Sequence, residues 1–252
     1  MQIENLSFSY GNQPTLKDIS FCVKRNAITT LIGANACGKT TLLKLMTKNL
    51  QPDSGKITFE STQLDRISIK DFAKRAAIVH QKNSAPDDLE VQALVAYGRL
   101  PYAAAFRRKT VEDEARIHFA MEATGILDLA DRPMGELSGG QRQRAFIAMA
   151  LAQNTPFLFL DEPTTFLDIR YQVEILRLIQ KLNREFHLTI VMVLHDINQA
   201  LVYSDEIIGM KQGEILVQGA PQTAITKNTI QDLYGIDLDI GYLDGRMWVL
   251  PT

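Results

Sequence analysis

A glycine-containing loop at residues 33–41, GANACGKTT, combines residue types that can hold a polyphosphate. It fits the pattern G-x-x-x-x-G-K-S/T, follows an apolar run at 28–32 that predicts a buried strand, and precedes a helix-forming stretch at 40–47. In this order, loop amides and the positive end of the helix converge on an anion. The predicted nucleotide contacts come from Gly33, Ala34, Asn35, Ala36, Cys37, Gly38, Lys39, Thr40 and Thr41.

The residue types in this loop suit the binding of phosphate groups and Mg²⁺. Gly33 and Gly38 let the backbone approach phosphate oxygens, and Lys39 supplies a compact positive charge to the β- and γ-phosphates. Thr40 offers a hydroxyl to Mg²⁺, and Thr41 is placed for the α-phosphate. A glycine turn before an ordinary helix is the alternative interpretation of this segment.

Two adjacent carboxylates end a second apolar run, FLFLDEP at 157–163. Carboxylates at the C-terminal end of a parallel strand lie where open α/β sheets bind ligands. We predict that Asp161 holds Mg²⁺ and that Glu162 is the base that orients and deprotonates the attacking water. The alternative is a solvated acidic turn in which Pro163 simply ends the strand.

A third segment, LSGGQ at 137–141, precedes a predicted helix at 141–152. Ser138, Gly139 and Gly140 are small enough to expose backbone amides at the positive end of that helix, which would make a second anion-seeking helix start. Taken alone, a serine N-cap followed by flexible glycines explains the segment better.

Composition limits the class of protein. The chain has 252 residues, of which 46% are apolar and 22% charged, with a net charge of −2, as in a soluble globular protein. No apolar run is long enough to span a membrane and no signal peptide is evident, so we expect a cytosolic protein. The charge gives no field for nucleic acid. Cys22 and Cys37 have no metal-ligand spacing and are expected to be free thiols.

Strands and helices are expected to alternate, with one long helical stretch between them. The predicted strands are 6–10, 19–23, 28–32, 56–59, 76–79, 157–160, 189–194 and 206–210. The predicted helices are 40–47, 91–97, 110–124 and 141–152, and one more carries the apolar stripe Ile175, Leu178, Ile179, Leu182 and Phe186.

Taken together and in this order, the loop at 33–41, LSGGQ and FLFLDEP resemble the motifs of ATP-binding cassette (ABC) proteins. The resemblance covers essentially the whole chain. It implies an α/β fold: a P-loop NTPase core with a mixed, mostly parallel sheet, an antiparallel β subdomain and an inserted helical subdomain. We expect one domain at 1–252, the insertion at 82–155, and a C-terminal extension at 220–252 with a hairpin about 243–246.

The resemblance also assigns roles to single residues. It implies that Tyr10 stacks on adenine, that Gln81 links the metal site to transport domains, and that His195 contacts the γ-phosphate. It places Asp168 in a loop that crosses a dimer interface. The alternatives are that Tyr10 is sheet core, Gln81 a loop amide and His195 an ordinary residue at a helix start.

In the same family the LSGGQ segment reaches the ATP held by a second copy, so the resemblance implies a head-to-tail dimer around two Mg·ATP. The signature and interface residues would be Ser138, Gly139, Gly140, Gln141 and Asp168. One position departs from the family pattern, because Ala36 stands where glycine is usual. A Cβ at this position is tolerated only if the backbone avoids the left-handed region.

Three further segments narrow the resemblance: AYGRLPY at 96–102, PTTFLDIRYQ at 163–172 and HDINQAL at 195–201. They look like ATPase subunits of bacterial importers for ferric siderophores, haem and cobalamin. That implies a second copy of the chain, a membrane permease dimer and an extracytoplasmic substrate-binding protein as partners, no nucleic acid, and a peripheral position on the cytoplasmic face of the membrane. The segment at 82–102 would receive the permease, although buried core explains most of its apolar residues as well.

Two alternatives remain at this point. One is an importer ATPase for another solute, and the other is an ABC ATPase without a transport role. The compact interval between the P-loop and LSGGQ lacks heptads and metal ligands, which argues against a chromosome-maintenance or repair ATPase. The single cassette argues against a translation factor, and the intact Glu162 against a nucleotide binder that does not hydrolyse.

Overall fold

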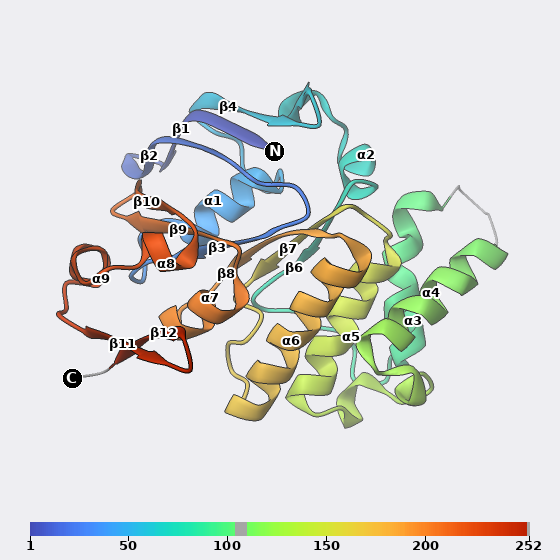
Figure 1. The fold of residues 1–252 in the computed structure, drawn as a ribbon. Coiled ribbons are helices and arrows are strands. Elements are labelled where there is room, and N and C mark those ends of the chain that lie inside the picture. Colours follow the sequence, from blue (N-terminus) through green and yellow to red (C-terminus); the bar gives the residue numbers. More distant parts are fainter. Residues whose placement is uncertain (104–109, 251–252) are drawn as a thin grey trace. The chain divides into compact units, whose positions relative to one another are not determined.

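The computed structural model describes residues 1–103 and 110–250 (Figure 1). They form two compact units, one built from residues 1–67 and 189–252 and the other from residues 68–188. Residues 104–109, inside the predicted insertion at 82–155, and the last two residues of the predicted extension lie outside the described residues.

The first unit contains an antiparallel sheet in the order β2-β1-β4-β5. Its strands are β1 (Gln2–Tyr10), β2 (Gln13–Cys22), β4 (Ser54–Phe59) and β5 (Thr62–Gln63). On β1 the apolar side chains of Ile3, Leu6 and Phe8 are buried between more exposed polar neighbours, the pattern of a sheet with one face in the core. This sheet matches the expected antiparallel β subdomain.

The first unit also contributes strands in the order β10-β9-β3-β8. They are β3 (Ile28–Ile32), β8 (Thr189–Val193), β9 (Glu206–Lys211) and β10 (Glu214–Gly219). β3 pairs in parallel with β8 and β9, whereas β10 is antiparallel to β9. All residues of β3 and β8 are buried, including Thr29, Thr30 and Thr189, as in a parallel sheet that is covered on both faces.

The helices of the first unit are α1 (Lys39–Met46), α7 (Ile197–Tyr203), α8 (Pro221–Ala224) and α9 (Lys227–Tyr234). The C-terminal hairpin is present as predicted: β11 (Asp239–Leu243) pairs with β12 (Arg246–Leu250). Its two turn residues, Asp244 and Gly245, have φ of 50° and 74°, the left-handed pair that a tight hairpin turn requires. Asn198 of α7 fixes the hairpin by two hydrogen bonds to the Val249 backbone, at 2.8 and 3.0 Å.

The second unit is mainly helical. It contains α2 (Ile69–Ala73), α3 (Val91–Ala96), α4 (Val111–Thr124), α5 (Gly139–Ala152) and α6 (Ile169–Phe186). Its strands β6 (Ala76–Val79) and β7 (Phe157–Asp161) pair in parallel. On α6, Ile175, Leu178, Ile179 and Leu182 of the predicted stripe are buried, which confirms them as core, whereas Phe186 at the end of the stripe is only partly buried.

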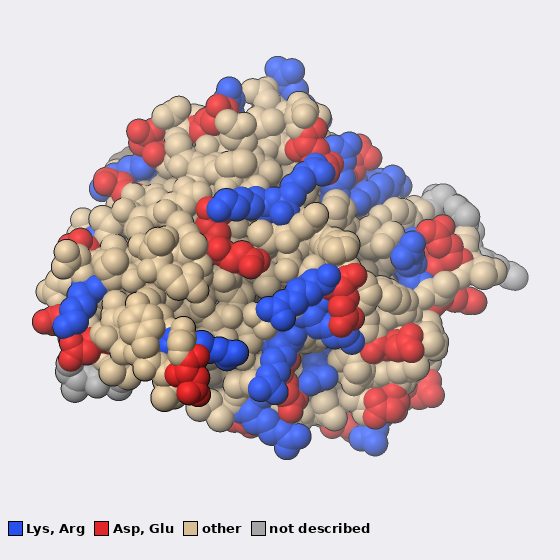
Figure 2. All heavy atoms as spheres, in the orientation of Figure 1, with Lys and Arg blue, Asp and Glu red and all other residues tan. Residues whose placement is uncertain are grey.

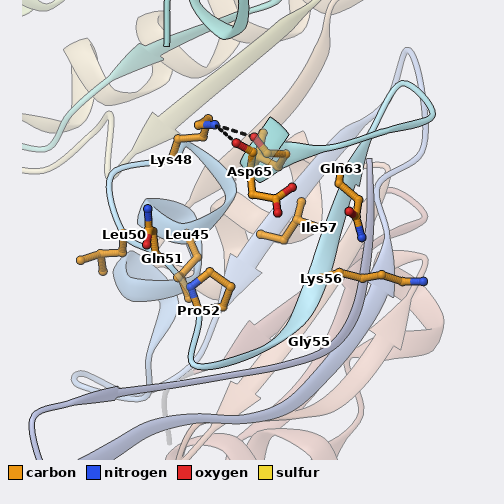
Figure 3. Close-up of a pocket in the computed structure, with 11 residues that line it drawn as sticks. Leu45, Lys48, Leu50, Gln51, Pro52, Gly55, Lys56, Ile57, Gln63 and Asp65 are labelled. Atoms are coloured by element: carbon orange, nitrogen blue, oxygen red, sulfur yellow. Dashed lines mark hydrogen bonds between the residues drawn. The ribbon is translucent and has the colours of Figure 1, made fainter. Parts of the chain in front are cut away.

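A pocket of about 180 Å³ lies in the first unit beside the C-terminal end of α1 (Figure 3). Lys48 closes one side of it, because its ammonium group donates to the carbonyl oxygens of Leu64 and Ile67. No residue of the loop at 33–41 lines this pocket. Elsewhere, Figure 2 shows acidic and basic side chains interspersed on the visible face, in keeping with a net charge near zero.

Candidate active site

The loop between β3 and α1 needs glycine at two positions for steric reasons. Gly33 has φ of 140°, and a methyl group there would lie 2.2 Å from the carbonyl oxygen of Met210. Gly38 has φ of 108°, and a methyl group there would lie 2.6 Å from the Leu16 side chain. Both contacts are too short for any Cβ, so these two glycines let the backbone make the tight loop predicted from the sequence.

The start of α1 has the electrostatics of an anion site. Its N-cap, Gly38, provides no side-chain hydrogen bond, and the first turn contains no acidic residue. Lys39 is only 5% exposed, and its ammonium group donates to the carbonyl oxygens of Gly33 and Ala34 at 2.8 and 2.9 Å. Uncapped amides and a buried cation held over the same loop favour a phosphate ligand over an ordinary glycine turn.

The backbone conformation of Ala36 differs from the one expected. Its φ is 61°, so the backbone occupies the left-handed region that a Cβ was expected to avoid. An L-residue in this region costs about 1 kcal/mol or more, and the loop carries that strain. Cys22 and Cys37 are free thiols, as expected, and Cys37 is buried.

The end of β7 places Asp161 and Glu162 next to each other in different surroundings. Asp161 is buried at the last position of the strand, with 5% of its surface exposed. Glu162 follows with φ of 52°, and its Oε2 atom accepts hydrogen bonds from Gln81 Nε2 and from Thr165 Oγ1, the latter at 2.9 Å. The fold therefore brings Gln81 to Glu162, and it adds Thr165, to which the sequence analysis assigned no role.

The LSGGQ segment begins α5. Ser138 is the N-cap, and it exchanges hydrogen bonds with Gln141 in a capping box at 2.9 and 3.3 Å. A methyl group at Gly140 would lie 2.3 Å from the Tyr171 ring, so packing against α6 excludes any larger residue there. At Gly139 the nearest side-chain atom would be 3.4 Å away, in Leu167. Ser138 therefore does cap α5. Packing against Tyr171 explains why residue 140 is a glycine, whereas the contacts around residue 139 would permit a larger side chain.

The remaining predicted residues are exposed. Tyr10 is 47% exposed and meets Phe8 edge to face at 4.9 Å between ring centroids, which excludes the sheet-core alternative. His195 lies two residues after the end of β8 and directly before Asp196, which caps α7. Asp168 caps α6 by accepting from the Tyr171 amide at 3.1 Å.

The candidate residues divide between the two units. The loop at 33–41, Tyr10 and His195 belong to the first unit. Gln81, the carboxylates at the end of β7, the LSGGQ segment and Asp168 belong to the second. Within the second unit, the contacts of Gly140 with Tyr171 and of Gly139 with Leu167 show that the signature and the segment around Asp168 adjoin.

Tyr234, at the end of α9, is a residue near the phosphate loop that sequence reasoning missed. Its hydroxyl is buried close to the backbone of Gly33. Burial raises the pKa of Tyr234 to about 12, while the nearby Gly33 amide acts in the opposite direction. No motif in the sequence marks this contact, because it depends on how α9 packs in the first unit.

Comparison with known proteins places these features in one family. A model of the ABC transporter family matches residues 16–165, more than half of the chain. The chain therefore belongs to the ABC transporter family. It is one of the ATP-hydrolysing members, as the motifs predicted.

Relatives and solved structures resemble the chain over most of its length. It is 42% identical to the iron(3+)-hydroxamate import ATP-binding protein FhuC of Bacillus subtilis (strain 168), over 95% of this chain and 89% of that protein. It is 41% identical to the ferric enterobactin transport ATP-binding protein FepC of Escherichia coli (strain K12), over 92% and 86%. An ATP-binding cassette solved as a dimer in a post-hydrolysis state with ADP and Pi superposes with a TM-score of 0.74 at 27% identity, over 87% of this chain and 98% of that one.

None of the helices in the described part of the chain is long and apolar enough to cross a membrane.

Proposed function

We propose that this chain is the ATPase subunit of a bacterial importer for a ferric siderophore or a related metal chelate such as haem or cobalamin. The observation that carries the ATPase assignment is the buried Lys39 at an uncapped helix start, together with a strand that ends in Asp161 and Glu162. The relatives that import ferric hydroxamate and ferric enterobactin support the substrate class.

Each unit has its own part in the proposed reaction. In the first, the amides at the start of α1 and the Lys39 ammonium bind the β- and γ-phosphates, Tyr10 offers an exposed ring to adenine, and His195 contacts the γ-phosphate. In the second, the Glu162 carboxylate takes a proton from the attacking water. Gln81 touches that carboxylate and so connects its own loop to the chemistry.

The candidate metal ligands suit Mg²⁺. Thr40, Gln81 and Asp161 offer a hydroxyl, an amide and a carboxylate oxygen, which are the hard donors that Mg²⁺ takes together with substrate phosphates. Among the described residues no group of three or more His, Cys, Asp or Glu could hold a metal on its own. When bound, Mg²⁺ would neutralise charge on the β- and γ-phosphates.

The proposed partners are a second copy of the chain, a membrane permease dimer and an extracytoplasmic substrate-binding protein, with the ATPase peripheral on the cytoplasmic face. The dimeric cassette bound to ADP and Pi supports the first of these. In the second copy's site, Ser138, Gly139, Gly140 and Gln141 would approach the γ-phosphate. Tyr97 and Leu100, 49% and 63% exposed, offer apolar surface to the permease within the segment predicted to receive it.

Uptake in a deletion strain tests the proposal. We expect loss of the gene to abolish accumulation of one radiolabelled iron chelate, haem or cobalamin, and wild type but not Lys39→Ala to restore it, because the variant lacks the cation of the phosphate site. Lys44→Ala, which removes an exposed lysine of the same helix, is the matched control and should complement. Unchanged uptake of all three classes, with a defect for an unrelated solute, would overturn the substrate class and leave the ATPase assignment standing.

A further inference from the structure

Thr165 is bound to Glu162 by both its backbone and its side chain. Its amide donates to the Glu162 carbonyl oxygen at 3.2 Å, and its hydroxyl donates to Glu162 Oε2 at 2.9 Å. The first bond closes the turn that follows β7. The second holds the carboxylate itself, so one threonine fixes both ends of the same residue.

Glu162 needs such support. Its φ of 52° lies in the left-handed region, which residues with a side chain occupy only when their surroundings hold them there. A glutamate side chain has several rotamers, and a base that removes a proton from water must present its oxygen in one of them. A hydrogen-bond donor in the same turn restricts the Glu162 carboxylate to fewer orientations.

Gln81 and Thr165, which both donate to Glu162 Oε2, lie at different distances from it along the chain. Gln81 is exposed and lies on the loop after β6, far from Glu162 in the sequence, and its amide is also a candidate metal ligand. Its contact with Glu162 therefore depends on how the loop after β6 is placed relative to the end of β7. Thr165 is three residues from Glu162 and is bound to the same turn, so its contact depends on that turn alone.

We propose that Thr165 is a positioning residue for the catalytic base, and that its hydroxyl holds the Glu162 carboxylate in the orientation that accepts the proton from water. This inference rests on the proposed role of Glu162. It adds the reason why the residue in the third position after the base carries a hydroxyl.

The test compares two substitutions at this position. Thr165→Val keeps the shape of the side chain and removes the hydroxyl, so we expect kcat for ATP to fall about tenfold, the size of one lost hydrogen bond to a charged group. The KM for ATP should stay within about twofold, because Thr165 acts on the chemical step. Thr165→Ser restores the hydroxyl and should recover most of kcat. Thr223→Val, which removes an exposed hydroxyl that donates to the Ala220 carbonyl oxygen, is the matched control and should leave kcat unchanged.

A double-mutant cycle with Glu162→Gln identifies the group through which Thr165 acts. In single-turnover hydrolysis, Thr165→Val should slow the Glu162→Gln enzyme by much less than it slows wild type, because the base it positions is already gone. Wild-type kcat in Thr165→Val, or a loss that adds in full to that of Glu162→Gln, would overturn the inference while leaving the base assignment intact. Wild-type hydrolysis by Glu162→Gln alone would overturn the base assignment first.

Discussion

Two residues of the candidate site adopt a backbone conformation that L-residues with a side chain seldom occupy. Glu162 and Ala36 both carry side chains in the left-handed region, with φ of 52° and 61°. Each such residue costs about 1 kcal/mol or more in stability. Glu162 follows β7 directly and Ala36 lies inside the loop at 33–41, so both of these predicted segments of the site contain a left-handed residue. Eleven other described non-glycine residues also have positive φ, so this conformation is not confined to the candidate site.

Replacing Ala36 measures that strain directly. Ala36→Gly relieves the clash of the Cβ but adds freedom to the unfolded chain, so we expect the free energy of unfolding to rise by about 0.5 kcal/mol. Ala34→Gly is the matched control, because Ala34 is exposed in the same loop without a positive φ, and it should be destabilising. Denaturant unfolding of wild type, Ala36→Gly and Ala34→Gly measures these differences in stability. A loss of stability in Ala36→Gly as large as in the control would show that the loop is unstrained at this position.

At the scale of elements, α5 and α6 form the part of the second unit in which signature and capping residues adjoin. Arg144 of α5 pairs with Glu174 of α6 at 2.8 Å, and Gly140 lies against the Tyr171 ring. The two glycines of LSGGQ therefore differ in their packing: Gly140 permits this helix contact, whereas a Cβ at Gly139 would meet no atom closer than 3.4 Å.

Alanine substitutions at the two glycines should change the free energy of unfolding by different amounts. Gly140→Ala forces a Cβ into the Tyr171 ring and should lower the free energy of unfolding by roughly 1–3 kcal/mol, the usual cost of overpacking. Gly139→Ala meets no atom closer than 3.4 Å and should leave stability unchanged or slightly higher. Thermal and denaturant unfolding of both variants provide the comparison. Equal destabilisation by the two alanines would contradict the division.

The start of α4 gives the second unit a pH-dependent contribution to stability. Hydrogen bonds from the Thr110 backbone and from Arg99 lower the pKa of Asp113 to about 2. Because the folded pKa is below the unfolded one of 3.8, this contribution is present above about pH 4 and is lost as the pH falls toward 2.

Asp113→Asn should therefore lower the free energy of unfolding at pH 7 by about 1 kcal/mol, because solvent screens this near-surface ion pair, and the deficit should shrink as the pH falls below about 4. Urea unfolding across this pH range measures the deficit. Glu112→Gln, at an exposed neighbouring position of the same first turn, is the control and should show a much smaller effect. A deficit for Asp113→Asn that does not depend on pH would contradict the assignment of this carboxylate.

At the scale of the whole molecule, the sequence predicted those features that depend on local signals. β3 and β6 begin and end at the predicted residues, because continuous apolar runs bounded by turns allow little else. The loop at 33–41, the carboxylates after β7 and the C-terminal hairpin were also predicted, since each depends on a few adjacent residues. The helices α8 and α9 were not predicted, although local signals are present: Pro221 begins α8, and α9 has a capping box of Thr226 and Thr229 and ends at Gly235.

Parts of the site that depend on contacts formed only in the folded chain could not be predicted from the sequence. The Tyr234 hydroxyl near Gly33 has no signal in the sequence, because it depends on packing across about two hundred residues of chain. Thr165 was visible within a threonine-rich segment, but its role depends on the turn that aims its hydroxyl at Glu162. Tyr10, His195 and Asp168 keep their proposed roles as predictions.

The central claim is that this chain hydrolyses ATP with Glu162 as the base, and hydrolysis by Glu162→Gln tests it most directly. The substitution keeps the size of the side chain and removes the base, so [γ-³²P]ATP should still bind while turnover falls by about two orders of magnitude or more. An ATP-bound dimer should accumulate, visible by size-exclusion chromatography, whereas Glu185→Gln, at an exposed position of α6, should behave as wild type. Hydrolysis near the wild-type rate by purified Glu162→Gln, with contaminating ATPase excluded, would contradict the account.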